Sequence, residues 1–184
     1  WPQKVAWNGK KFQYRGTFVS LTENFCSIGM EQPAGNKITG NPSSHPALSV
    51  KWVEDFPDIP LNRNEAYKLR VTSKGVEIEA ITETGVYRAI QTLRQLTEKK
   101  GNGIAITGCE ITDWPAFRIR GFMQDVGRTY ISTDELKREI AILARYKINV
   151  FHWHLTENQA WRLQSKVFPM LNDSVNTTRQ PGKY

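Results

Sequence analysis

The chain has 184 residues, of which 39% are hydrophobic and 23% are charged, and its formal net charge is +7. This length and apolar content exclude intrinsic disorder, and no stretch approaches the ~20 apolar residues of a membrane span. The basic residues are dispersed along the chain rather than clustered, which argues against a nucleic-acid-binding protein.

The first 60 residues show short strand signals around a polar loop. Asn8-Gly9 is typical of a hairpin turn, so strands are predicted over 4–7 and 17–21. A short helix is predicted over 25–32. The loop that follows is rich in Gly, Pro and Ser and includes His45, which is expected to be solvated rather than a ligand. A further strand is predicted over 48–52.

Residues 65–99 carry the clearest pattern of the first half. Apolar and polar residues alternate over 67–72 and 76–80 around a turn at 73–75, which predicts an antiparallel hairpin with one buried face. On its other face, oppositely charged side chains are expected to pair across the strands, namely Lys68, Arg70, Glu77 and Glu79. Apolar residues then recur at helical spacing, which predicts a helix from 84 to 99.

A domain boundary is predicted at Asp113-Trp114-Pro115, after short strands at 104–106 and 109–111, because proline interrupts regular structure. Residues 1–115 are therefore predicted to form one α+β domain, an antiparallel sheet with a packed helix. This half contains no catalytic constellation, and a scaffolding role is expected.

The second half reads as strand, helix, strand. Strands are predicted over 118–124 and 148–155, and a helix over 133–146 in which Ser132 and Glu135 form a capping box. Two strands joined by such a helix make a parallel βαβ unit, in which polar side chains after the strands meet at one edge. Asp125, Arg128, Glu157 and Asn158 should therefore converge in a site.

Neither the histidines nor the cysteines form a metal-binding pattern. His152 and His154 point to the same side of their strand, but no third ligand is evident, so buried, hydrogen-bonded structural histidines are expected. Cys26 and Cys109 lie far apart, so two buried free thiols are expected, with a single disulfide as the alternative.

The segments RGFMQDVGR and KINVFHWHLTENQAWR resemble the first two barrel strands of glycoside hydrolase family 20, the β-N-acetylhexosaminidases. The resemblance implies that residues 116–184 begin a (β/α)8 TIM barrel behind the α+β domain. The residues after Pro115 are far fewer than the ~250 of a complete barrel, so the barrel is expected to be incomplete and the chain a fragment.

The resemblance also assigns roles to the site residues. Arg128 is expected to bind hydroxyls of the terminal sugar, with a salt bridge to Asp125 as the alternative, and Asp125 is expected to support Arg128 or its loop. Glu157 occupies a position where the family commonly has an aspartate that accepts from a histidine in contact with the catalytic acid. A local cap is the alternative for Glu157. Supporting roles are expected for Asn158 and His154. Trp161 and Arg162 are expected to pack and brace the loop, with stacking on the sugar as the alternative for Trp161.

The family's reaction is a substrate-assisted, retaining hydrolysis of terminal β-linked GlcNAc or GalNAc, without a metal or organic cofactor. It requires an adjacent Asp-Glu pair on a later strand. The one such dipeptide here, Asp134-Glu135, opens the helix as capping residues. The chain is therefore expected to be the N-terminal part of an exo-β-N-acetylhexosaminidase and to be inactive alone. A non-catalytic carbohydrate-binding or scaffold module is the alternative.

Glycan-degrading relatives imply a periplasmic, cell-surface or secreted protein, although the N-terminus lacks the apolar segment of a signal peptide. The sequence does not indicate the oligomeric state or a preference between GlcNAc and GalNAc.

Overall fold

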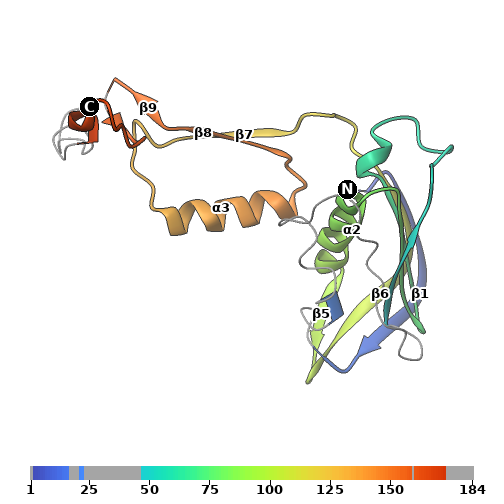
Figure 1. Cartoon of the computed structure of the whole chain (residues 1–184). Coiled ribbons are helices and arrows are strands. Elements are labelled where there is room, and N and C mark those ends of the chain that lie inside the picture. Colours follow the sequence, from blue (N-terminus) through green and yellow to red (C-terminus); the bar gives the residue numbers. More distant parts are fainter. Residues whose placement is uncertain (1, 17–20, 23–46, 159, 173–184) are drawn as a thin grey trace. The chain divides into compact units, whose positions relative to one another are not determined.

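The structure, a computed structural model, describes residues 2–16, 21–22, 47–158 and 160–172. The chain divides into two compact units, Trp1–Arg118 and Ile119–Tyr184 (Figure 1). Within the described residues, no helix combines the length and the hydropathy needed to cross a bilayer. The predicted helix over 25–32, His45, Cys26 and most of the predicted strand over 17–21 lie outside the described residues.

The first unit is built on a six-stranded sheet. Five strands lie in the order β1 (Lys4–Tyr14), β6 (Gly103–Asp113), β3 (Tyr67–Thr72), β4 (Gly75–Ala80) and β2 (Leu48–Trp52), and β5 (Thr97–Lys100) also pairs with β6. All pairs are antiparallel except β2 with β4, so the sheet is mixed where a purely antiparallel one was predicted. The segment between β2 and β3 contains η1 (Arg63–Glu65), and it lets β2 run beside β4 in the same direction.

The core of this unit lies between the sheet and α2 (Glu83–Gln95), which Figure 1 shows against one face of the strands. The predicted alternation is confirmed, since every second residue of β3 and of β4 is buried. The buried stripe of α2 packs on them with Val86, Ala89, Ile90 and Leu93. Burying each large aliphatic side chain contributes about 1.5–3 kcal/mol.

The first turn of α2 lies close to the residue before β3 because Gly85 has no side chain. A Cβ at Gly85 would lie 2.5 Å from the carbonyl oxygen of Ala66. The helix is capped at its start by Thr82, whose hydroxyl accepts from the Gly85 N–H at 3.3 Å. The position of α2 therefore depends on both residues.

The hairpin predicted at Asn8-Gly9 is wrong, because β1 continues through it as one strand. Gly9 has φ +71°, and the pairing of β1 with β6 shifts between Trp7 and Lys11. The Asn8 side chain donates to the carbonyl of Val71 at 3.0 Å and accepts from the Lys10 N–H at 3.1 Å. The Asn-Gly pair thus forms an irregularity inside a strand, where Asn8 makes one local hydrogen bond and one to a strand distant in the sequence.

The end of α2 and the strands after it also differ from the prediction. The helix ends at Gln95 rather than 99, because Thr97–Lys100 pairs with β6 as β5. The two short strands predicted at 104–106 and 109–111 are a single strand, β6. At its centre Gly108 makes room for β1, since a Cβ there would lie 2.1 Å from Oδ1 of Asn8.

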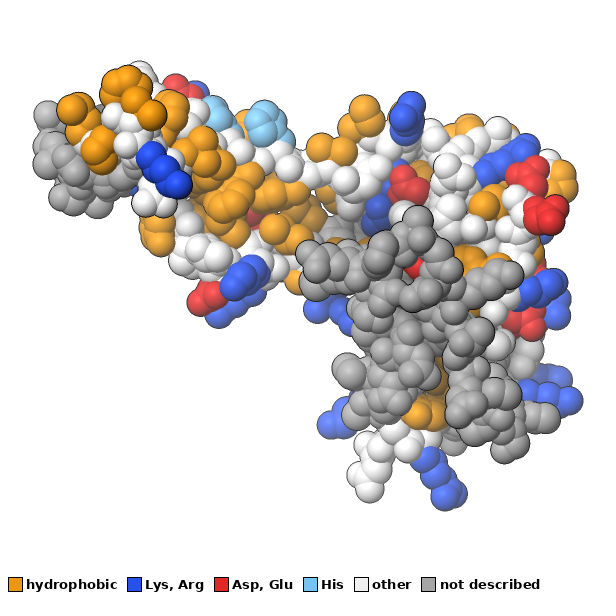
Figure 2. Space-filling view, viewed as in Figure 1, with side chains coloured by type: hydrophobic (Ala, Val, Ile, Leu, Met, Phe, Trp, Pro, Cys, Tyr) orange, Lys and Arg blue, Asp and Glu red, His pale blue; other side chains and the backbone are white. Residues whose placement is uncertain are grey.

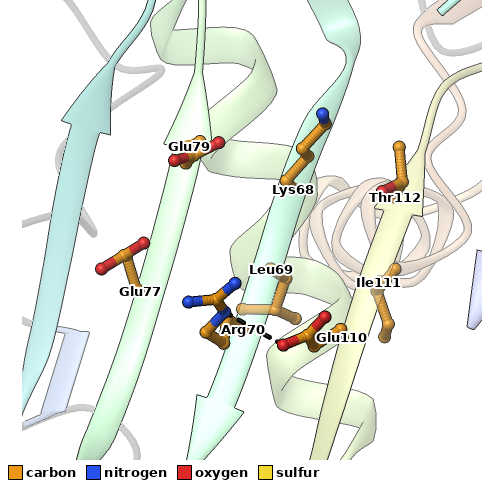
Figure 3. A pocket seen from close by; sticks show the side chains of 8 residues that line it. All are labelled: Lys68, Leu69, Arg70, Glu77, Glu79, Glu110, Ile111 and Thr112. Atoms are coloured by element: carbon orange, nitrogen blue, oxygen red, sulfur yellow. Dashed lines mark ion pairs between the residues drawn. The ribbon is translucent and has the colours of Figure 1, made fainter. Parts of the chain in front are cut away.

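The outer face of the sheet carries charged side chains around a hollow of about 110 Å³ (Figure 3). Lys68 is in register with Glu79, and Arg70 with Glu77, as the sequence predicts. Lys68 and Arg70 nevertheless form their ion pairs with other residues. Lys68 pairs with Asp58 at 3.0 Å, and Arg70 pairs with Glu110 at 3.1 Å. Exposed pairs of this kind stabilise a fold by about 1 kcal/mol or less.

The second unit begins with β7 (Gly121–Asp125), α3 (Thr133–Arg145) and β8 (Val150–His154). The two strands pair in parallel, which confirms the βαβ prediction. The Ser132–Glu135 capping box is present in both directions. A short hairpin of β9 (Thr156–Glu157) and β10 (Ala160–Trp161) follows, and then η2 (Pro169–Asn172).

Large apolar side chains are exposed across the second unit, where Figure 2 shows them in orange. They include Phe122, Met123, Ile140, Ile142, Trp153 and Leu163. Of the residues of α3, Leu136 alone is buried. A parallel sheet normally has both faces covered, so these two strands and one helix are the start of a barrel that is incomplete in this chain.

Candidate functional site

The site lies where the two parallel strands end. Asp125 is the last residue of β7, and it stands in register with His154, the last residue of β8. The N–H of Val126 donates to the carbonyl of His154 at 3.0 Å, which continues the pairing one residue beyond the strand. The segments that follow both strands therefore start side by side.

Asp125 organises the loop that carries Arg128. Its Oδ1 accepts from the backbone N–H of Arg128 at 3.0 Å, and its Oδ2 forms an ion pair with Nη1 of Arg128, also at 3.0 Å. The backbone hydrogen bond, aided by the charges of Arg128 and His154, lowers the pKa of Asp125 below its ordinary value of 3.8 against the opposing effect of desolvation. The carboxylate is therefore ionised at neutral pH.

Glu157 closes the cluster from the β9–β10 hairpin. Its Oε2 lies 3.0 Å from Nη2 of Arg128, and its Oε1 accepts from the N–H of Asn158 at 3.3 Å. The guanidinium thus lies between two carboxylates, one at each terminal nitrogen. Glu157 can lie this close to the Arg128 loop because Gly127 has no side chain. A Cβ at Gly127 would lie 2.8 Å from Cβ of Glu157.

His154 lies between the same two carboxylates without a hydrogen bond to either. Its Nδ1 is 3.7 Å from Oδ2 of Asp125, and its Nε2 is 3.7 Å from Oε2 of Glu157. The prediction of buried histidines is wrong, because His152 is exposed and His154 is only partly buried. Asp125, His154 and Glu157 are of the types that bind metals and lie within reach of one cation. The guanidinium of Arg128 supplies positive charge at 3.0 Å from both carboxylates and so offsets part of their negative charge.

The structure brings together four of the six predicted site residues: Asp125, Arg128, His154 and Glu157. Asn158 is exposed and contributes its backbone N–H to Glu157. Trp161 is partly buried, and its indole N–H meets no acceptor among the described residues. Two carboxylates also stand beside His154, for which the sequence predicts only a supporting role.

A polar cluster at the carboxyl ends of parallel strands joined by a helix is the arrangement found on the ligand side of α/β barrels. Models of glycosyl hydrolase family 20 match most of the chain, with domain 2 over residues 26–114 and the catalytic domain over 117–183. The chain belongs to glycosyl hydrolase family 20.

Curated relatives support this membership. A Beta-hexosaminidase from Porphyromonas gingivalis is 42% identical over 159 residues, which is 83% of this chain and 18% of that protein. A Beta-N-acetylhexosaminidase from Cellulomonas fimi is 39% identical over 68% of this chain and 25% of that protein. The chain thus spans about a fifth to a quarter of the length of these relatives.

Solved structures agree with the fold. The exo-β-N-acetylglucosaminidase of Vibrio harveyi, in complex with N-acetylglucosamine, has a TM-score of 0.71 at 30% identity, over 93% of this chain and 27% of that one. The β-N-acetylhexosaminidase of Bacteroides fragilis has a TM-score of 0.70 at 30% identity, over 92% of this chain and 35% of that one.

Proposed function

We propose that this chain is the N-terminal part of an exo-β-N-acetylhexosaminidase that removes terminal β-linked GlcNAc or GalNAc from glycans. The family membership and the names of the relatives support the reaction class. Because the chain spans only part of those relatives, the activity is assigned to the longer protein. The part described here supplies one wall of its sugar site.

The observation that carries the proposal is the orientation of Arg128. Ion pairs at Nη1 and Nη2 hold its guanidinium plane, while 57% of the side chain is exposed to solvent. A planar guanidinium held in this way can donate to two adjacent hydroxyls at a defined angle. We therefore assign Arg128 to the hydroxyls of the terminal sugar, with Asp125 and Glu157 supporting it.

The proposed reaction is substrate-assisted. The 2-acetamido oxygen of the sugar attacks the anomeric carbon, an aspartate orients the acetamido group, and the neighbouring glutamate protonates the leaving oxygen. In this chain the one Asp-Glu dipeptide, Asp134-Glu135, begins α3, and Glu135 is occupied in the capping box. The reacting pair is therefore proposed to lie in the longer protein, with no metal or cofactor involved.

The test is hydrolysis of an aryl β-N-acetylglucosaminide by the full-length protein. Wild type should turn it over, and Arg128→Ala should lower kcat/KM by about 10²-fold, because two charge-assisted hydrogen bonds are lost. Arg138→Ala removes an exposed arginine from α3 and serves as the control, with unchanged activity. Full activity of the Arg128→Ala protein would refute the role of Arg128.

The same assay separates the enzyme from a carbohydrate-binding module. A full-length protein that binds N-acetylglucosamine in calorimetry but does not hydrolyse the aryl substrate would be such a module. The 184-residue chain by itself is expected to show no turnover, and measurable turnover would contradict the assignment of the acid to the longer protein.

A further inference from the structure

Arg162, directly after β10, links the two segments that carry the site. Its backbone N–H donates to the carbonyl of Leu155, and its Nε donates to the carbonyl of Val126, both at 2.9 Å. Its guanidinium also lies over the ring of Tyr130, with Cζ 5.6 Å from the ring centroid. Leu155 precedes β9, while Val126 and Tyr130 flank Arg128. One residue therefore joins the Glu157 hairpin to the Arg128 loop.

Val126 is the point at which this link acts. Its N–H donates to the carbonyl of His154, its carbonyl accepts from Arg162, and its side chain is only 3% exposed. Both backbone polar groups are thus satisfied by residues from beyond its own loop. Next to it, a Cβ on Gly127 would lie 2.8 Å from Cβ of Glu157, so the loop packs against the hairpin at a distance that only glycine allows.

We infer that Arg162 is a positioning residue, which acts through Val126 and sets the orientation in which Arg128 meets the sugar. This inference rests on the proposed function and extends it. Arginine suits the task because its Nε–H can donate in the plane of the guanidinium while the face of that plane packs on an aromatic ring. Loss of this link releases the Arg128 loop without removing any group that contacts the sugar.

The test uses the full-length protein with the aryl β-N-acetylglucosaminide and, separately, calorimetric binding of N-acetylglucosamine. Arg162→Gln should raise KM and the Kd of the monosaccharide by about tenfold each, the effect expected for a lost charge-assisted hydrogen bond, and should change kcat less. Arg162→Lys should recover part of the loss, since an ammonium can donate to Val126. Arg138→Gln is the matched control and should match wild type.

A double-mutant cycle distinguishes positioning from general destabilisation. If Arg162 acts through Arg128, adding Arg162→Gln to Arg128→Lys causes little further loss of affinity. Fully additive losses would overturn the inference, and so would unchanged KM and Kd in the single variant. Should Arg162→Gln fail to fold, Tyr130→Leu removes the stacking ring and should raise KM by a smaller factor, whereas no rise overturns the inference. A wild-type protein that neither binds nor hydrolyses would instead contradict the proposed function itself.

Discussion

At the scale of the residue, the lowered pKa of Asp125 makes a prediction about the pH dependence of stability. A carboxylate whose pKa is lowered by folding stabilises the protein above its unfolded pKa, and this contribution is lost as the pH falls through the lower, folded value. The backbone N–H of Arg128 is the main cause of the lowered pKa of Asp125. The unfolding temperature of wild type should therefore exceed that of Asp125→Asn above pH 3.8, and the difference should shrink as the pH falls below it.

Thermal unfolding followed by circular dichroism from neutral to strongly acidic pH measures this difference. Asp134→Asn provides the control, because Asp134 is largely exposed and its ion pair with Lys137 is long, at 3.9 Å. A difference between wild type and Asp125→Asn that did not depend on pH would show that the ionised form of Asp125 does not stabilise the fold.

Cys109 makes a second prediction at this scale. The residue is a free thiol with no exposed surface, and burial raises its pKa to about 11. Since the thiolate is the reactive form, Cys109 should not react with iodoacetamide in the native protein at mildly alkaline pH and should react fully after denaturation in guanidinium chloride. Mass spectrometry of a Cys26→Ser protein checks this, and rapid native labelling would mean that the sheet opens around Cys109.

At the scale of the elements, Tyr67 joins three parts of the first unit. Its hydroxyl, on β3, donates to Oδ2 of Asp113 on β6 at 3.0 Å and lies 2.6 Å from Oγ1 of Thr92 on α2. Asp113 in turn accepts from the N–H of Gln3, next to β1, at 3.1 Å. Burial and the charge of Asp113 raise the pKa of Tyr67 well above 10, so the hydroxyl stays protonated and keeps donating.

Tyr67→Phe should therefore lower the free energy of unfolding by about 1–2 kcal/mol, because Asp113 and Thr92 lose a buried hydrogen-bond partner. Urea denaturation of the full-length protein and of the chain measures the change. Tyr87→Phe removes the hydroxyl of a partly buried tyrosine on α2 and is the control. Equal stability of the two variants would show that the buried network is not stabilising.

At the scale of the whole molecule, the exposed apolar side chains of the second unit predict how the chain behaves alone. Met123 is 51% exposed and Trp153 is 48% exposed, on strands of a kind that are normally covered on both faces. The 184-residue chain should bind the dye ANS more strongly per molecule than the full-length protein. Fluorescence titration of both proteins provides the comparison, and equal dye binding would indicate that these faces are covered in the chain itself.

The sequence by itself determined the elements whose signals are local. The alternation in β3 and β4 and the stripe of α2 follow from burial of one face, and the Ser132–Glu135 capping box lies within one turn of helix. The parallel pairing of β7 and β8 also followed, because a helix between two strands permits little else. The long motif of the second half was sufficient to indicate the family.

Only the tertiary structure decided features that depend on distant neighbours. Asn8-Gly9 became part of β1 because Asn8 bonds to Val71, and Thr97–Lys100 became a strand because β6 was available to pair with it. The same holds for the site. The sequence placed Asp125, Arg128 and Glu157 after strands. The pairing of both carboxylates with the guanidinium of Arg128, however, requires a contact between segments far apart along the chain, and so does the hydrogen bond from Arg162 to Val126.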